Sequence, residues 1–114
     1  MEGKTVIILD IDEGLKVVTY GQEPEMYENI QKVVGGRFES IPPINFKKKF
    51  RDYYFFVNEG GRMLKLPKNE LIDSYLEPDC ETFYVGNVFI LKSDENGDTI
   101  SLTKEDIELF KKTL

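Results

Sequence analysis

The residues best suited to chemistry form a short basic run, "KKKFR" at residues 47–51, followed closely by tyrosines. Lysine and arginine side chains bind phosphate groups, and aromatic rings stack on nucleobases. The run therefore predicts a site for a nucleotide-like ligand. The alternative interpretation is a solvated loop whose charges keep the next strand from pairing with another chain. The cations and rings concerned are Lys47, Lys48, Lys49, Arg51, Tyr53 and Tyr54.

A second stretch with chemical potential is "SDENGDTISLTKEDIELF", in which acidic residues alternate with Asn and Gly. An EF-hand calcium loop needs Gly at its sixth position and a helix before it. Counted from Asp94, the sixth position is Thr99, and the preceding residues are strand-like. We therefore interpret the stretch as a polar turn and a short strand, followed by a helix capped by Thr103 and Asp106. No metal site is expected.

The absence of histidine limits the catalytic chemistry further. The chain has no histidine and only one cysteine, Cys80. Without histidine, Ser-His-Asp and Cys-His catalysis and the usual catalytic zinc sites are excluded. Asp10 and Asp12 form a carboxylate pair, but no partner motif supports a catalytic dyad. We therefore expect no catalytic residues, no cofactor and no enzymatic activity.

Length and charge set the broad class of protein. The 114 residues fit a single domain over residues 1–114. The net charge of -6 opposes binding to duplex DNA, which depends on cations that neutralise phosphates. No apolar run approaches the roughly 18 residues that a membrane span requires. A single cysteine cannot form an intrachain disulfide, and this suits a reducing compartment. We expect a cytoplasmic protein that does not bind membranes.

Apolar periodicity and turn residues predict an α+β fold, with a mostly antiparallel β-sheet and two or three helices. A helix is expected in "EPEMYENIQKVVGG", ended by Gly35, and another in "KNELIDSYL" after Pro67. Ile107, Phe110 and Leu114 are expected to form the inward stripe of the last helix. Strands are expected at residues 5–11, 15–20, 37–41, 52–58, 62–66, 82–91 and 99–102.

Two glycine positions predict special backbone geometry. Residues 59–61 are expected to form a hairpin turn that leads strand 52–58 back into strand 62–66. Gly86 interrupts the longest apolar run, and this predicts a bulge or a close approach of the backbone to another segment.

Several stretches together resemble a known family, and they stand in that family's order. "QKVVGGRFESI" is similar to its "lq-x-hVGG-h-hE" element, and "FFVNEGGRMLKLPKN" is similar to its "hhNEeGkhhgLPxN" hairpin. "FYVGNVFILKSDENGDTISLTKEDIELF" resembles its closing strand, turn and helix. These stretches cover most of residues 27–111. The family is domain of unknown function 3846, small proteins of bacteriophages, plasmids and their bacterial hosts.

The resemblance implies an accessory protein of a mobile element, and it supplies no catalytic residues. Most positions that recur in the family are suited to turns and packing. Asn58, Glu59 and Asn69 are the polar exceptions and are candidates to line a pocket near the hairpin. Arg62 makes this hairpin more cationic than the family pattern, and Arg37 is a further cation worth testing.

We expect a non-enzymatic accessory protein that acts in counter-defence, by sequestering a nucleotide-derived signal or by blocking a host defence protein. A sequestering protein is expected to be a homo-oligomer, because small domains gain pocket walls at subunit interfaces. The alternative is a protein-interaction module with no small-molecule ligand, which an exposed aromatic face on the "DYYFF" strand would favour. An enzyme acting through carboxylates or lysine is the third possibility.

Overall fold

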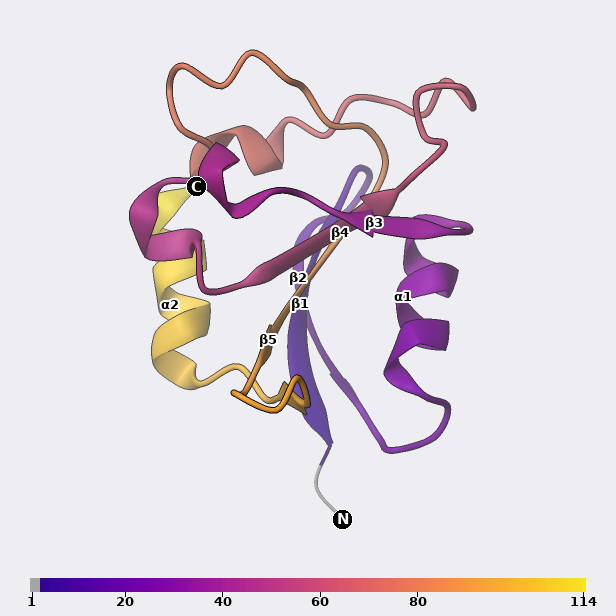
Figure 1. The fold of residues 1–114 in the computed structure, drawn as a ribbon, viewed down its shortest axis with the longest axis vertical. Coiled ribbons are helices and arrows are strands. Elements are labelled where there is room, and N and C mark those ends of the chain that lie inside the picture. Colours follow the sequence, from indigo (N-terminus) through magenta and orange to yellow (C-terminus); the bar gives the residue numbers. More distant parts are fainter. Residues whose placement is uncertain (1–2) are drawn as a thin grey trace.

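Six antiparallel strands form the central sheet in the computed structural model, which describes residues 3–114 (Figure 1). They are hydrogen bonded in the order β2-β1-β5-β4-β3, and β6 pairs with β5. This arrangement confirms the predicted α+β class. The strands are β1 (Lys4–Asp10), β2 (Gly14–Tyr20), β3 (Phe38–Ser40), β4 (Tyr54–Asn58), β5 (Val88–Ser93) and β6 (Thr99–Ile100).

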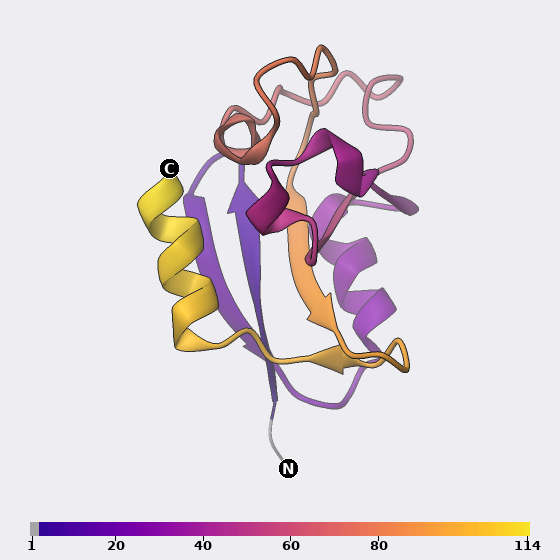
Figure 2. The same ribbon diagram turned by 60° about the vertical axis from the view of Figure 1, so that its left-hand side comes forward.

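Helical segments cover both faces of this sheet. The helix α1 (Met26–Val34) packs on one face, and α2 (Lys104–Thr113) packs on the other (Figure 1). Three short 3-10 segments lie on the same side as α2 (Figure 2). These are η1 (Pro43–Asn45), η2 (Lys48–Phe50) and η3 (Leu71–Tyr75). Helical segments therefore cover part of each face of the sheet.

The hairpin of β1 and β2 follows the predicted segments. Alternation along β1 directs Val6 and Ile8 toward α1, and it directs Ile7 and Leu9 toward the α2 side. A strand that is buried on both faces must be apolar throughout, as the run "TVIILDI" indicated. Gly14 has a φ of 86°, a left-handed conformation that glycine adopts without steric cost.

An aromatic cluster fills the space between the sheet and α2. Its members Phe46, Phe50, Phe55, Tyr75 and Phe110 are all buried. The rings of Phe46 and Phe55 stack with centroids 3.9 Å apart, and those of Phe50 and Phe110 lie 5.0 Å apart. The hydroxyl of Tyr75 donates a 2.6 Å hydrogen bond to the carbonyl of Phe110. Because Phe46 and Phe50 flank Lys47, Lys48 and Lys49, they fasten the basic run to the core.

Both predicted helix caps are confirmed. Gly35 ends α1 with a φ of 88°, and its N–H donates to the carbonyl of Gln31. Thr103 begins α2 with a capping box, because its side chain accepts from the backbone of Asp106 and the Asp106 carboxylate accepts from Thr103 N–H. The predicted inward face of this helix is only partly confirmed. Phe110 is buried, but Leu114 is exposed because it lies beyond the last helical residue.

The expected strand at residues 62–66 is absent from the described chain, and so is the hairpin that it would complete. Both edges of β4 are already paired, with β3 and with β5, so no position remains for a returning strand. These residues coil instead, with hydrogen bonds from Leu64 N–H to the Gly60 carbonyl and from Leu66 N–H to the Gly61 carbonyl.

The long strand predicted for residues 82–91 begins only at Val88. Gly86 interrupts it with a φ of 77°, and a Cβ atom there would lie 2.9 Å from Cδ1 of Leu66. The predicted close backbone approach is therefore confirmed, and it shortens the strand. The helix expected in "KNELIDSYL" is likewise only the 3-10 segment η3, which buries Ile72 and Tyr75.

Candidate functional site

The cationic groups of the basic run do not converge on a single binding site. The ammonium of Lys47 donates to the carbonyl of Ser74 at 2.9 Å. Arg51 donates from Nε to the Phe46 carbonyl at 2.9 Å and forms an ion pair of 3.5 Å with Glu77. These groups tie the basic run to η3 and its neighbours, while Lys48 and Lys49 are exposed on η2.

The tyrosines expected to stack beside those cations lie on opposite faces of the sheet. Tyr53 is buried on the α2 side, where its ring meets that of Phe110 at a centroid distance of 4.9 Å. Tyr54 is exposed on the α1 side, where it stacks with Phe56. Adjacent strand residues point to opposite faces, so this alternation was available from the sequence.

Asp106 joins Tyr53 to the start of α2. Its carboxylate accepts a hydrogen bond from the Tyr53 hydroxyl and another of 2.7 Å from Thr103 N–H, and Lys92 lies 3.6 Å away. Burial alone would raise the pKa of Asp106, but these hydrogen bonds and the Lys92 charge outweigh it and lower that pKa. Burial, followed by the bond to Asp106, raises the pKa of Tyr53. The cluster holds α2 against the sheet.

The buried amide of Asn69 also serves the fold. Its Nδ2 donates to the carbonyls of Leu9 and Gly86, each at 2.9 Å, and its Oδ1 accepts from Ile72 N–H at 3.3 Å. The side chain is 1% exposed. It therefore fastens β1, the Gly86 turn and η3 together, away from the other predicted site residues.

Asn58 fastens another junction. Its Nδ2 donates to the carbonyl of Val34 at 3.1 Å, and its Oδ1 accepts from Gly60 N–H at 2.8 Å. A single buried side chain thus connects the end of α1 with the turn after β4. Asn58, expected from the sequence to line a pocket, therefore also has a structural role.

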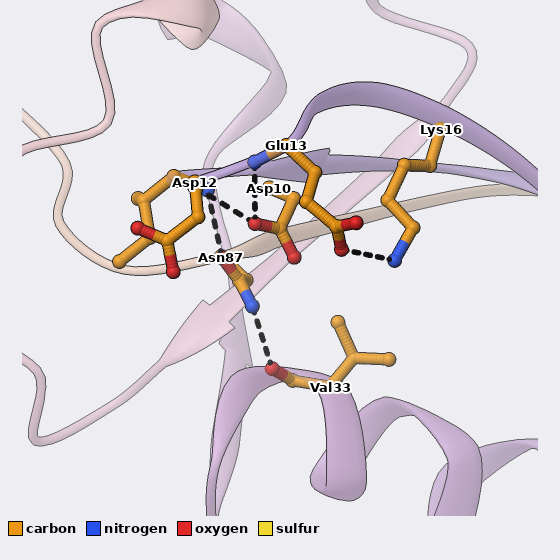
Figure 3. Close-up of polar contacts among 7 residues, drawn as sticks. Asp10, Asp12, Glu13, Lys16, Val33 and Asn87 are labelled. Carbon is orange, nitrogen blue, oxygen red and sulfur yellow. Dashed lines mark hydrogen bonds and ion pairs between the residues drawn. The ribbon is translucent and has the colours of Figure 1, made fainter.

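The acidic turn between β1 and β2 is held by its own side chains (Figure 3). The Asp10 carboxylate accepts from Asp12 N–H at 2.8 Å, and this hydrogen bond is the main reason that its pKa is lowered. Asn87 accepts from Ile11 N–H at 3.0 Å and donates to the Val33 carbonyl at 3.3 Å, which joins the turn to α1. The Asp10 carboxylate therefore caps the turn.

A polar pocket of about 440 Å³ lies on the α2 side of β3 and β4, and it brings together Asn58, Glu59 and Arg62 from the predicted set. Arg62 lies over the ring of Phe83 at 4.7 Å and donates to the Phe83 carbonyl at 2.5 Å. Arg37, beside the pocket, pairs with Glu59 at 3.8 Å. The lining side chains that carry charge are Glu39, Glu59 and Arg62.

A second pocket, which we call the aromatic groove, lies between α1 and the sheet and measures about 360 Å³. Tyr54 and Phe56 stack at a centroid distance of 6.1 Å, and Phe38 meets Phe56 edge-on at 5.1 Å. Tyr27 is 52% exposed and Tyr54 is 47% exposed. The groove is lined by Met26, Tyr27, Ile30, Phe38, Tyr54, Phe56, Leu91, Ser93, Gly97 and Thr99.

No charged side chain lines the aromatic groove, so its chemistry is the burial of apolar and aromatic groups. Sequence reasoning missed it, apart from Tyr54. Two signals were present: Tyr54 and Phe56 alternate along β4, and Met26 and Ile30 share one face of α1. The sequence could not predict that this face of α1 lies beside this face of β4.

The described residues were also searched for metal-binding clusters and for membrane-spanning helices. Among residues 3–114, no group of three or more His, Cys, Asp and Glu side chains is placed to hold a metal ion. Within the same residues, none of the helices is long and apolar enough to cross a membrane.

The fold and its pockets define a small α+β protein with an antiparallel sheet between two helical layers. The chain belongs to the family described as Domain of unknown function (DUF3846), whose model matches residues 3–114. The resemblance read from the sequence is therefore confirmed over nearly the whole chain. No curated protein and no solved structure matches it.

Proposed function

We propose that this protein is a non-enzymatic binding protein that holds a partner protein in the aromatic groove. The carrying observation is the aromatic side of β4, where the exposed Tyr54 and the half-buried Phe56 join the exposed Tyr27 of α1. Exposed aromatic rings are the side chains most enriched at protein interfaces. This exposure favours the protein-interaction module over the small-molecule ligand among the functions expected from the sequence.

Sequestration of a nucleotide-derived signal is the less favoured form of binding. Such a ligand needs cations that converge near a stacking ring, whereas Lys47 and Arg51 bind backbone carbonyls. The surface beside the aromatic groove carries Lys4 and the carboxylates of Glu25 and Asp98. The two carboxylates repel phosphate and outnumber the single lysine. We further propose, on the family resemblance, that the partner is a host protein and that the chain is an accessory of a mobile element.

The test is affinity capture from bacterial lysate with tagged wild-type protein and a Tyr27→Ser/Tyr54→Ser double variant. We expect wild type to enrich a defined protein that the double variant loses by at least tenfold. Ile44→Ser is the matched control, because Ile44 is 69% exposed and lines neither the aromatic groove nor the polar pocket. Enrichment that is equal for wild type and the double variant would contradict the proposal.

Native mass spectrometry of the same preparations reads subunit number and retained small molecules together. We expect no added mass of nucleotide size. A retained nucleotide-sized mass that disappears in the double variant would replace partner binding with sequestration. The same spectrum tests the homo-oligomer expected of a sequestering protein, whose pocket walls would come from more than one subunit.

A further inference from the structure

The strand β3 is an edge of the sheet, and its backbone has an open side. Glu59 N–H donates to the Arg37 carbonyl at 3.0 Å, and Ile41 N–H donates to the Phe55 carbonyl at 2.9 Å. Hydrogen-bonded pairs alternate along an antiparallel ladder, so the backbone groups of Glu39 also point toward β4. Those of Phe38 and Ser40 therefore point away from the sheet.

Nothing in the described chain pairs with this open side. In the sheet order β3 is terminal and contacts β4 alone. Glu39 and Ser40 are exposed. An open strand edge is a template for pairing with another chain unless a protein protects it. The opposite edge, β2, carries Lys16 near its middle, a residue type that discourages such pairing.

The two pockets lie on opposite faces of this same edge. Phe38 lines the aromatic groove on the α1 side. Glu39, the next residue, lines the polar pocket on the α2 side together with Glu59. None of the ion pairs found within residues 3–114 involves Glu39, whereas Glu59 is paired with Arg37. A free carboxylate and an apolar groove therefore alternate along the strand.

We propose that β3 accepts an extended segment of a partner protein as an added strand, with apolar side chains in the aromatic groove and a Lys or Arg beside Glu39. In strand addition, backbone hydrogen bonds supply affinity and pockets for alternate side chains supply specificity. The residue of the added strand opposite Phe38 faces the groove. The residue opposite Glu39 faces the polar pocket, where its positive charge complements the free carboxylate.

The proposal rests on the proposed function and specifies the partner's chemistry. Because β3 is only three residues long, few backbone hydrogen bonds can form. Side-chain burial in the groove and the charge pair must therefore contribute much of the affinity. The recognised segment is a short extended peptide in which apolar and basic residues alternate.

The first experiment measures binding of a fluorescein-labelled decapeptide of alternating Val and Arg by fluorescence anisotropy. We expect it to bind wild type, and the peptide with Glu in place of Arg to bind at least tenfold more weakly. Glu39→Lys should reverse this preference. Glu95→Lys, which changes the net charge equally in an exposed turn, should not. Equal effects of the two variants would show attraction by net charge and overturn the basic-side-chain assignment.

The second experiment tests the backbone pairing. Ser40→Pro removes an N–H that faces away from β4, which an edge strand tolerates, and Ser40→Ala is the matched control. We expect the peptide to bind Ser40→Pro about fivefold more weakly than Ser40→Ala. A peptide that is N-methylated on alternate nitrogens should lose binding to wild type, which keeps the test valid if Ser40→Pro does not fold.

Amide hydrogen exchange locates the bound strand. We expect the peptide to slow exchange at Phe38 and Ser40, which point outward, and to change Glu39 little. Binding that needs Tyr54 but leaves these amides unchanged, or no binding at all, would overturn strand addition. The lysate capture then decides separately whether the groove binds a partner. If neither the peptide nor a protein from the lysate binds, the proposed function is also excluded.

Discussion

Buried polar side chains decide how separate segments of this chain meet. Asn69 uses both Nδ2 hydrogens and its Oδ1 on backbone groups of three different segments. Asn58 connects the end of α1 with the turn after β4 in the same way. A buried amide whose partners are all backbone groups specifies a unique arrangement, because every alternative packing leaves one of those groups unsatisfied.

Removing the Asn69 amide should therefore destabilise the fold. Asn69→Ala removes the hydrogen bonds to the carbonyls of Leu9 and Gly86 and the bond accepted from Ile72 N–H, and we expect the free energy of unfolding to fall by about 1–3 kcal/mol. Urea denaturation followed by circular dichroism measures it. Asn96→Ala, in an exposed turn, is the control and should lie within about 0.5 kcal/mol of wild type. A similar loss in both variants would refute the role of Asn69.

The carboxylate of Asp106 predicts a pH dependence. Its pKa in the folded protein is lower than the ordinary 3.8, so the ionised form stabilises the fold at neutral pH. This contribution is lost as the pH falls through the folded-state pKa. We expect the free energy of unfolding of wild type to fall more steeply below about pH 5 than that of Asp106→Asn.

Asp79→Asn, at an exposed carboxylate, should keep the slope of wild type. The measurement is a series of urea titrations between about pH 2 and pH 7. Parallel curves for wild type and Asp106→Asn would show that the cluster of Tyr53, Lys92 and Asp106 contributes nothing that depends on ionisation.

At the scale of elements, turns and caps place the walls of the aromatic groove. The left-handed Gly35 ends α1, so that the chain turns at once into β3 and brings Phe38 beside the helix. On the far side, the capping box and the carboxylate of Asp106 hold α2 over the aromatic cluster. The groove wall formed by α1 and Phe38 is therefore positioned by a local cap, and α2 is held on the opposite face by a second cap together with the contact between Asp106 and Tyr53.

Gly35→Ala should destabilise the protein by about 1 kcal/mol, because an alanine at a φ of 88° is strained, while its Cβ would make only an ordinary contact of 3.9 Å with Asn58 Nδ2. Gly21→Ala is the matched control, since nothing lies within 4 Å of its Cβ position and its φ is not left-handed. Thermal or urea unfolding measures both variants. A neutral Gly35→Ala would mean that the backbone relaxes at this cap.

At the scale of the whole molecule, charge and exposed apolar surface act in opposite directions. The net charge of -6 at pH 7 keeps copies apart, and the sequence pI is near 4.7. Against this repulsion, the loop after β4 exposes Met63 by 90% and Leu64 by 62%, and the ring of Phe83 also faces solvent. Loss of net charge removes the repulsion and leaves the apolar contacts.

We therefore expect light scattering by the folded protein to be greatest near pH 4.7. A Met63→Ser/Leu64→Ser variant should scatter less at that pH while its unfolding curve stays within about 0.5 kcal/mol of wild type. Ile44→Ser, at another exposed apolar residue, is the control for a general loss of hydrophobicity. Equal scattering by wild type and the double variant would exclude this loop as the contact.

Features that depend on neighbouring residues could be predicted from the sequence. A β-branched apolar run and turn chemistry defined the β1–β2 hairpin, helical periodicity with Gly35 defined α1, and Thr103 with Asp106 defined the start of α2. Each depends on residues a few positions apart, so the interaction energies can be read from spacing alone. The family resemblance could be recognised from the sequence because it too rests on short stretches of neighbouring residues.

The partners of each segment, by contrast, were set by long-range packing. Pairing of β4 with β5 as well as β3 excluded a strand at residues 62–66. The same packing directed Lys47 and Arg51 to backbone carbonyls, and it placed the Tyr54 side of β4 against α1. Long-range contacts of this kind depend on which apolar faces are buried together, and no local spacing records that choice.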